Sequence, residues 1–328
     1  MVDGKIPQTK KCARGAAIAA LFASAVLAAT LAAGCGKGPQ PAAEVKAPET
    51  FASPDAAGKA VYDACKASDT NALLTVFGSN GKEIVSSGDP VHDQSNLKNF
   101  VTAYDQMHRL DPLKDGAQIL TIGAENYPFP VPLVKNSSGQ WYFDTDSAKG
   151  EILARRVGQN ELDTMDALYA MSDAQDEYYS QLHDGSTVQQ YAQKFVSDPG
   201  KHNGLVWNVA EGEPESPLGP LAAKASADGY TSSAEPYHGY FYRILTKQGE
   251  YAEGGAQDFI VNGNMTGGYA ILAFPAEYRN SGVMTFIITD EGAIYQKDLG
   301  ADTATAAKAI DAVNLDSSWK LVGDDQQQ

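Results

Sequence analysis

The C-terminal third of the chain alternates between hydrophobic and polar positions in short runs. In residues 283–290, Met284, Phe286 and Ile288 fall on one side of an extended backbone, and two threonines fall on the other. A period of two is typical of a half-buried β-strand. Similar runs occur at residues 237–245, 258–262, 267–274 and 293–299. Gly and Asn residues between the runs are typical of tight turns. The pattern predicts an antiparallel β-meander.

A helical period dominates the middle of the chain, over residues 146–183. One face of this predicted helix mixes apolar and polar side chains: Glu161, Met165, Leu168, Gln175, Tyr179 and Leu182. A buried glutamate must be paired or protonated, so Glu161 is expected to pair with one of three arginines, Arg155, Arg156 or Arg243. We call these three arginines, Glu161 and Gln175 the polar pin, because they would fix the helix against the sheet; a binding site is the alternative.

Helix and strand patterns alternate in the N-terminal half. Caps and apolar stripes predict helices at residues 53–65, 70–77 and 93–108. Strand patterns follow at residues 117–122 and 140–144. The three prolines between them remove ladder donors, which predicts a sheet edge or an extended segment. With a short helix at residues 303–313, the chain is predicted to be α+β: N-terminal helices with a small curved sheet, then a long helix packed on a C-terminal antiparallel β-meander.

The amino terminus has the composition of an export signal. Residues 1–14 are basic, and an apolar run too short for a comfortable membrane span follows. The sequence LAAGC at residues 31–35 resembles the lipobox of bacterial lipoproteins, although an ordinary signal peptide with a chance cysteine is the alternative. The resemblance implies cleavage before Cys35, acylation of its thiol and anchoring in a membrane. Gly36, rather than an aspartate, follows the cysteine, which resembles Gram-negative lipoproteins that are sorted to the outer membrane by default.

This interpretation divides the chain into a signal (1–34), a lipidated cysteine with a flexible tether (35–50), and the folded part. The tether is predicted from its Pro, Ala and charged residues without periodicity, and residues 323–328 are predicted to be a disordered tail. Cys12 leaves with the signal, so no internal disulfide is possible in the mature chain. Helical spacing behind Val61 predicts that Cys65 is a small buried side chain. We expect an outer-membrane lipoprotein that faces the periplasm.

The formal charge of the 328-residue chain is −16, with 43% hydrophobic and 20% charged residues. A globular protein of this charge repels nucleic acid and anionic surfaces. A nucleic-acid partner is therefore not expected, whereas solubility and cationic partners are favoured.

Aromatic residues cluster around a long stretch rich in Gly, Pro and Ser, residues 197–236. Loops of this length inside a domain are usually functional or partly disordered. The five members of this aromatic cluster are candidates to line a glycan or peptide groove: Trp207, Tyr230, Tyr237, His238 and Tyr240. The alternative is a loop that its aromatic side chains hold onto the sheet.

One cluster contains the residue types of acyl-transfer catalysis, in the sequence SSGDPVHD at residues 86–93: Ser86, Ser87, Asp89, His92 and Asp93. A catalytic triad is assembled from separate elements, and no GxSxG motif occurs here. The favoured interpretation is a turn that leads to a helix capped by Asp93 or Ser95. The five histidines are scattered without an HExxH pattern, so neither a metal site nor a cofactor is predicted.

Many motifs in order resemble one bacterial envelope family, a domain of unknown function catalogued as twenty-nine-fifty. They include YPFPVPLV, RRVGQNEL, PYHGYFYRIL and GVMTFIITDEGAIYQKDLG, within residues 51–322. The resemblance implies a secreted or lipid-anchored protein without an assigned activity, and it provides no functional residues.

Two weaker resemblances concern shape. Residues 51–146 resemble nuclear-transport-factor-2-like folds, and residues 147–322 resemble the globular part of type IV pilin-like proteins. We expect a binding or structural module that holds an envelope protein or glycan near the membrane. An envelope hydrolase that uses carboxylates or the cluster at residues 86–93 is the alternative.

Overall fold

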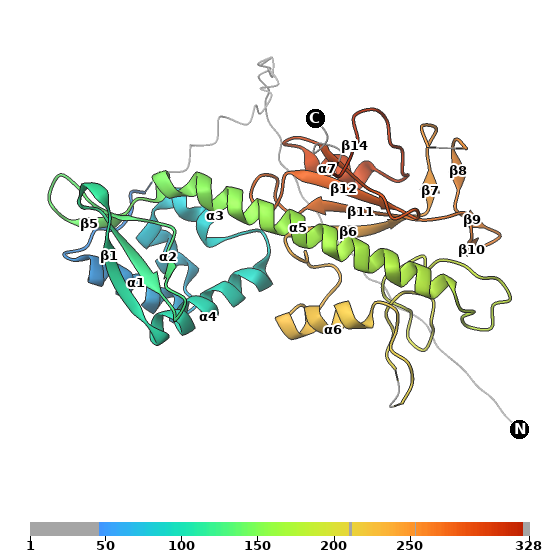
Figure 1. The fold of residues 1–328 in the computed structure, drawn as a ribbon, viewed down its shortest axis with the longest axis horizontal. Helices are drawn as coiled ribbons and strands as arrows, with labels where there is room; N and C mark the ends of the chain where they lie inside the picture. The colour runs from blue at the N-terminus through green and yellow to red at the C-terminus, as the bar shows by residue number, and fades with distance from the viewer. Residues whose placement is uncertain (1–45, 210–211, 253, 324–328) are drawn as a thin grey trace, which may run out of the picture. The chain divides into compact units, whose positions relative to one another are not determined.

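The computed structural model describes residues 46–209, 212–252 and 254–323, and their fold is α+β, as predicted (Figure 1). These described residues belong to one compact unit, in which two hydrophobic cores are the largest. The predicted signal, Cys35, most of the tether and residues 324–328 lie outside the described residues. The division near residue 146 stays a prediction.

Side-chain caps define the N-terminal helices. The Ser53 hydroxyl accepts the amide of Ala56, and the Asp69 carboxylate accepts that of Ala72, so each satisfies an otherwise unpaired amide of a first turn. Four helices and one 3-10 turn result: α1 (Pro54–Lys66), α2 (Thr70–Phe77), η1 (Ser79–Gly81), α3 (Lys82–Val85) and α4 (Pro90–Gln106). The predicted cap of α4 was wrong: Asp89, not Asp93 or Ser95, caps this helix, because Pro90 can occupy its first position.

These helices pack on an antiparallel sheet. Its order is β1-β2-β4-β5, and β3 pairs with β2. The strands are β1 (His108–Pro112), β2 (Gln118–Ile122), β3 (Tyr127–Pro128), β4 (Leu133–Lys135) and β5 (Trp141–Phe143), with a 3-10 turn η2 (Lys114–Gly116). The two predicted strands are confirmed as β2 and β5. The predicted helix end at His108 was wrong, because β1 begins there.

The long helix is confirmed as α5 (Thr145–Tyr179). Leu168 and Gln175 on its predicted face are fully buried, whereas Leu182 lies beyond the helix and is 57% exposed. The predicted extension to His183 was therefore wrong.

The C-terminal sheet is the predicted antiparallel meander, in the order β14-β13-β12-β11-β6. Its strands are β6 (Tyr240–Leu245), β11 (Ala270–Pro275), β12 (Met284–Thr289), β13 (Ile294–Asp298) and β14 (Lys320–Leu321). All six residues of β11 are buried. Because successive side chains of a strand point to opposite faces, both faces are covered there, and α5 and α7 (Thr303–Ala309) pack against this strand (Figure 1).

Three details of this half differ from the prediction. Residues 258–262 do not join the main sheet but contribute to two small ribbons between β6 and β11. The ribbons are β7 (Lys247–Gln248) with β8 (Gln257–Asp258), and β9 (Ile260–Val261) with β10 (Asn264–Met265). The predicted irregular stretch contains a helix, α6 (Gly219–Asp228), and α7 ends at Ala309 rather than at residue 313.

Candidate functional site

Two sequence motifs that lie far apart in the chain meet at Asp89. Its carboxylate caps α4 by accepting the amides of Val91 and His92 at 3.1 and 3.0 Å. The second carboxylate oxygen accepts the Tyr230 hydroxyl at 2.6 Å and the Gly239 amide at 3.1 Å. Asp89 is only 1% exposed, and four donors match the roughly four acceptor sites of a carboxylate. This arrangement, which we call the Asp89 joint, satisfies a buried charge without a cation.

A tight turn carries the next members of the aromatic cluster. Tyr237 and Tyr240 exchange backbone hydrogen bonds of 2.8 and 3.1 Å, with His238 and Gly239 between them at φ 52° and 74°. A Cβ at Gly239 would lie 2.8 Å from both the Asn160 side chain and the Ser281 Cβ. Only glycine fits this close approach without displacement. The turn thus places the Gly239 amide on Asp89.

His238 lies beside a carboxylate but gains little from it. Its Nδ1 is 3.6 Å from the Asp163 carboxylate. Burial lowers the pKa of His238, while the Asp163 charge opposes this effect and Lys224 and His92 reinforce it. Desolvation therefore outweighs the ion pair and favours the neutral imidazole.

A groove of about 660 Å³ lies between α5, α6 and the segments around residues 195–208 and 230–237. Its most enclosed residues are apolar, and hydroxyl-bearing residues line its exposed rim. The apolar floor includes Met171, Val206, Leu218 and Leu221, and the rim includes Ser226, Thr231, Ser232 and Ser233. Glu235 is the one charged residue among the described residues of the lining. This composition suits an apolar ligand group with uncharged polar neighbours.

The aromatic cluster divides between the groove and the core. Tyr230 and Tyr237 line the groove, so Tyr230 connects it to the Asp89 joint. Tyr240 is fully buried and donates its hydroxyl to the Met284 carbonyl at 2.9 Å. Trp207 instead packs with its ring against Tyr178, His183 and His202. Neither Trp207, His238 nor Tyr240 lines the groove.

One groove residue has an unsatisfied polar atom. The Tyr237 hydroxyl is buried and has no hydrogen-bond partner among the described residues. Burial, followed by the charges of Asp228 and Asp163, raises the pKa of Tyr237 to about 12. The hydroxyl is therefore neutral and can donate a hydrogen bond. Leaving it unpaired costs about 1–3 kcal/mol.

The serine and histidine cluster is not assembled for catalysis. The Ser87 hydroxyl exchanges hydrogen bonds with the Asp89 backbone, and the Ser87 amide donates to the Asp93 carboxylate at 3.0 Å. Among the hydrogen bonds of the described residues, none joins a serine hydroxyl to the His92 ring. The motif forms the turn that delivers Asp89.

The polar pin has different partners from those predicted. The pairing of Glu161 with an arginine was wrong: its carboxylate accepts the amides of Val283 and Met284 at 2.9 and 3.0 Å. Two backbone amides thus take the place of the expected cation. Gln175 exchanges hydrogen bonds of 2.9 and 2.8 Å with the Ala192 backbone. Both residues join α5 to other segments.

The three arginines of the polar pin bind to different parts of the molecule. Arg155 forms an exposed pair with Glu151 at 2.7 Å on its own helix. Arg156 donates to the Glu83 and Ile84 carbonyls and to the Asn280 side chain. Arg243 donates to carbonyls at the end of α7 and just beyond it, those of Ala307, Lys308 and Ile310. Only Arg156 and Arg243 thus bind segments distant in the sequence.

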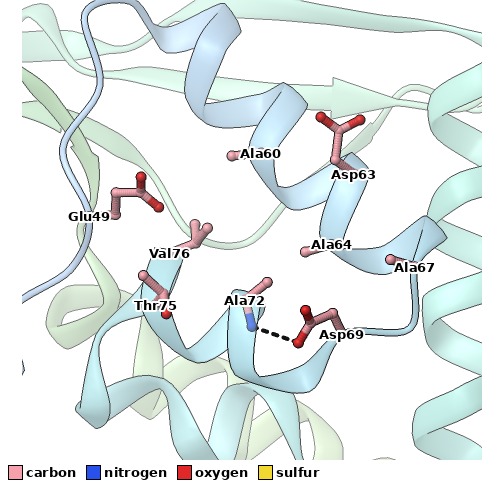
Figure 2. A pocket seen from close by; sticks show the side chains of 9 residues that line it. All are labelled: Glu49, Ala60, Asp63, Ala64, Ala67, Asp69, Ala72, Thr75 and Val76. Atoms are coloured by element: carbon pink, nitrogen blue, oxygen red, sulfur yellow. Dashed lines mark hydrogen bonds between the residues drawn. The ribbon is translucent and has the colours of Figure 1, made fainter.

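A second hollow lies between α1 and α2, and Figure 2 shows its residues. Its volume is about 410 Å³, and its lining includes four alanines and three carboxylates, those of Glu49, Asp63 and Asp69. Asp69 is engaged as the cap of α2, and Asp63 pairs with Lys59 at 2.5 Å. The short alanine side chains offer few contacts, so the α5–α6 groove is the better candidate site.

Other sequence-based candidates give no site. Cys65 is buried, and burial raises the pKa of its thiol to about 12, as suits a small core side chain rather than a nucleophile. Within the described part of the chain, no group of three or more His, Cys, Asp and Glu side chains is arranged to hold a metal ion. Among the same residues, no helix is both long and apolar enough to cross a bilayer.

A family model described as "Protein of unknown function (DUF2950)" matches residues 48–322. No curated protein and no solved structure matches the chain. The resemblances to pilin-like and nuclear-transport-factor-2-like folds are therefore not confirmed.

Proposed function

We propose that this chain, which belongs to the DUF2950 family, is a cell-envelope lipoprotein that holds an extended segment of another polypeptide in the α5–α6 groove. The observation that carries this proposal is the groove itself, with an apolar floor under a rim of hydroxyl groups. Because the family has no assigned activity, the support comes from the groove and from the amino-terminal sequence.

The lining favours a polypeptide over a glycan. Sugar rings stack on exposed aromatic faces and need many hydrogen bonds, whereas the four aromatic residues of this lining are all partly buried: Phe195, Tyr230, Tyr237 and Tyr242. The most enclosed floor positions, Met171 and Leu218, are aliphatic. An apolar side chain would fill the floor, and the segment's amides would face the rim hydroxyls. Tyr237 also lines the groove, although its hydroxyl is buried beneath the surface that a bound segment would contact.

The lipobox-like sequence at residues 31–35 supports attachment to a membrane. Acyl chains on Cys35 would contribute about 0.8 kcal/mol for each buried CH₂ group. The tether would leave the groove accessible to partners near the bilayer. Replacing Cys35 with alanine should release the protein from the membrane fraction and abolish labelling by radioactive palmitate; retention in that fraction would argue against the lipid anchor.

Peptide selection tests the groove directly. Random peptides displayed on phage are selected on the full chain, and the enriched peptides are titrated calorimetrically. Selected sequences should share an apolar side chain. Leu221→Asp places a charge on the floor and should weaken binding by about 10-fold or more.

Leu162→Asp is the matched control, because Leu162 lies on α5 and is 57% exposed. It should change affinity by less than about 2-fold. Ala225→Trp, which adds a ring to the groove wall, should block binding without adding a charge. Equal affinities for all four proteins would overturn the proposal, as would selective binding of envelope oligosaccharides in place of peptides.

A further inference from the structure

A separate cavity of about 480 Å³ lies beside the C-terminal sheet, at the turn between β12 and β13. Residues from the β7–β8 ribbon and from the segment after α7 complete its wall. Four aromatic side chains and two carboxylates dominate the lining: Tyr251, Phe259, Tyr269, Tyr295, Asp290 and Glu291. No lysine or arginine is among the described residues that line it.

The carboxylates of this cavity lack a positive partner. Neither Asp290 nor Glu291 forms an ion pair with any described residue, whereas Asp311 on the neighbouring segment pairs with Lys247 at 2.7 Å. Burial raises the pKa of Asp290, and the negative charges of Glu291 and Asp176 raise it further. A cation in the cavity would relieve this repulsion.

Backbone geometry places one carboxylate at this position. A Cβ at Gly268 would lie 2.5 Å from an Asp290 carboxylate oxygen. The glycine, at φ 123°, therefore lets the carboxylate rest against the backbone. The neighbouring Thr289 also lines the cavity, and its hydroxyl is buried without a hydrogen-bond partner in the described structure.

An aromatic ring is available at the cavity mouth. Tyr251 is 63% exposed, and its ring stacks on no other ring among the described residues. Aromatic faces attract cations, with gains of about 0.5–2 kcal/mol according to the degree of desolvation. Rings together with carboxylates select an organic cation that has both an apolar stem and a charged head.

We propose that this cavity binds a primary alkylammonium group of the kind that a lysine side chain carries. The stem would pack against the aromatic lining, and the ammonium would lie between Tyr251 and the two carboxylates. A lysine of a partner protein and a free diamine share this chemistry. The cavity is lined by none of the residues of the α5–α6 groove, so either proposal can fail without the other.

The test is a calorimetric titration of the full chain with Nα-acetyl-lysine methylamide. Nα-acetyl-norleucine methylamide, which has a similar stem and no charge, is the comparison ligand. The lysine compound should bind at least about 10-fold more tightly and lose affinity as salt is added. Equal binding of the two ligands to the unmodified protein would overturn the proposal, as would no saturable binding of either.

Substitutions of lining residues test whether the lysine compound binds in this cavity. The double substitution Asp290→Asn with Glu291→Gln should reduce the affinity for the lysine compound by about 10-fold, and Tyr251→Leu should reduce it by about 3-fold. Glu250→Gln changes an exposed acid on the same segment that does not line the cavity, and it should leave the affinity unchanged. If Glu250→Gln weakens binding as much as the double variant, nonspecific attraction explains the binding and the site is rejected.

A third ligand distinguishes the two sources of the ammonium group. 1,4-Diaminobutane should bind more tightly than the lysine compound if free diamines are the natural ligand, and less tightly if the lysine of a protein is. Either order supports an alkylammonium site, provided that the double variant weakens both ligands.

Discussion

The Asp89 joint and the α5–α6 groove differ in how their polar groups are satisfied, although Tyr230 belongs to both. At the joint, four donors satisfy the carboxylate of Asp89. In the groove, the Tyr237 hydroxyl is also buried, but it has no partner among the described residues. Satisfied buried groups stabilise a fold, whereas a buried hydroxyl without a partner lowers its stability. We expect substitutions to separate the two regions on this basis.

The largest effect is expected at the joint. Asp89→Ala removes the cap of α4 and leaves the Tyr230 hydroxyl and the Gly239 amide without an acceptor. The free energy of unfolding should fall by about 3 kcal/mol, from the lost cap and the unpaired donors, as measured by urea denaturation.

Glu125→Ala is the control, because Glu125 is an exposed turn residue. It should change the free energy of unfolding by less than about 0.5 kcal/mol. A loss as small for Asp89→Ala would mean that the joint does not hold the fold.

The next effect concerns the turn that reaches the joint. Gly239→Ala places an alanine at a φ of 74°, and its Cβ would lie 2.8 Å from the side chains of Asn160 and Ser281. Both effects are unfavourable, so this substitution should lower the free energy of unfolding by about 2 kcal/mol. Gly263→Ala has a similar φ of 85° and nothing within 4 Å of the added Cβ. Thermal unfolding should show a smaller loss for Gly263→Ala, and equal losses would show that the close approach is unimportant.

A pair of tyrosine substitutions compares the two regions most closely. Tyr230→Phe removes a donor to a buried carboxylate and should cost about 1.5 kcal/mol of unfolding free energy. Tyr237→Phe removes a buried hydroxyl that has no partner, so the free energy of unfolding should rise, by up to about 1–3 kcal/mol. The comparison fails if urea denaturation gives Tyr237→Phe the larger loss.

The smallest effect is a pH dependence at His238. Its pKa in the folded protein lies below the ordinary value of 6.5, so the unfolded chain binds the proton more readily. The stability contributed by the neutral imidazole is present above pH 6.5 and is lost as the pH falls toward the lower folded pKa. His238→Asn tolerates the positive φ and should remove this part of the pH profile. Identical slopes for both proteins between pH 7 and pH 5 would contradict the assignment.

Local sequence patterns predicted most of the elements. The alternation at residues 283–290 and the long helical period became β12 and α5. Helix α6 was not predicted because the sequence around it is rich in Gly, Pro and Ser, and its apolar side chains form only a weak helical stripe. Residues 258–262 have the sequence pattern of a short strand. A local pattern does not determine which other strand a segment pairs with.

The site could be predicted only in part. The aromatic cluster pointed to Tyr230 and Tyr237, which do line the groove. Its apolar floor includes Leu218 and Leu221, which lie in the predicted irregular stretch and were not among the predicted site residues. The hydrogen bond between Asp89 and Tyr230 spans 141 residues, and no pattern within one segment shows which residues approach across such a separation. Glu161 was expected to need a cation because side-chain chemistry suggests one, whereas folding supplied two backbone amides.

Site-specific photocrosslinking in intact cells tests the central claim most directly. A photoreactive amino acid replaces Leu221 in the groove or, as the comparison, the exposed Leu162 on α5. The proposal predicts a discrete crosslinked species from position 221 in which mass spectrometry identifies a second polypeptide, and none from position 162. Equal crosslinking at both positions, or a species from position 221 that a glycan-degrading enzyme returns to the mass of the uncrosslinked chain, would contradict it.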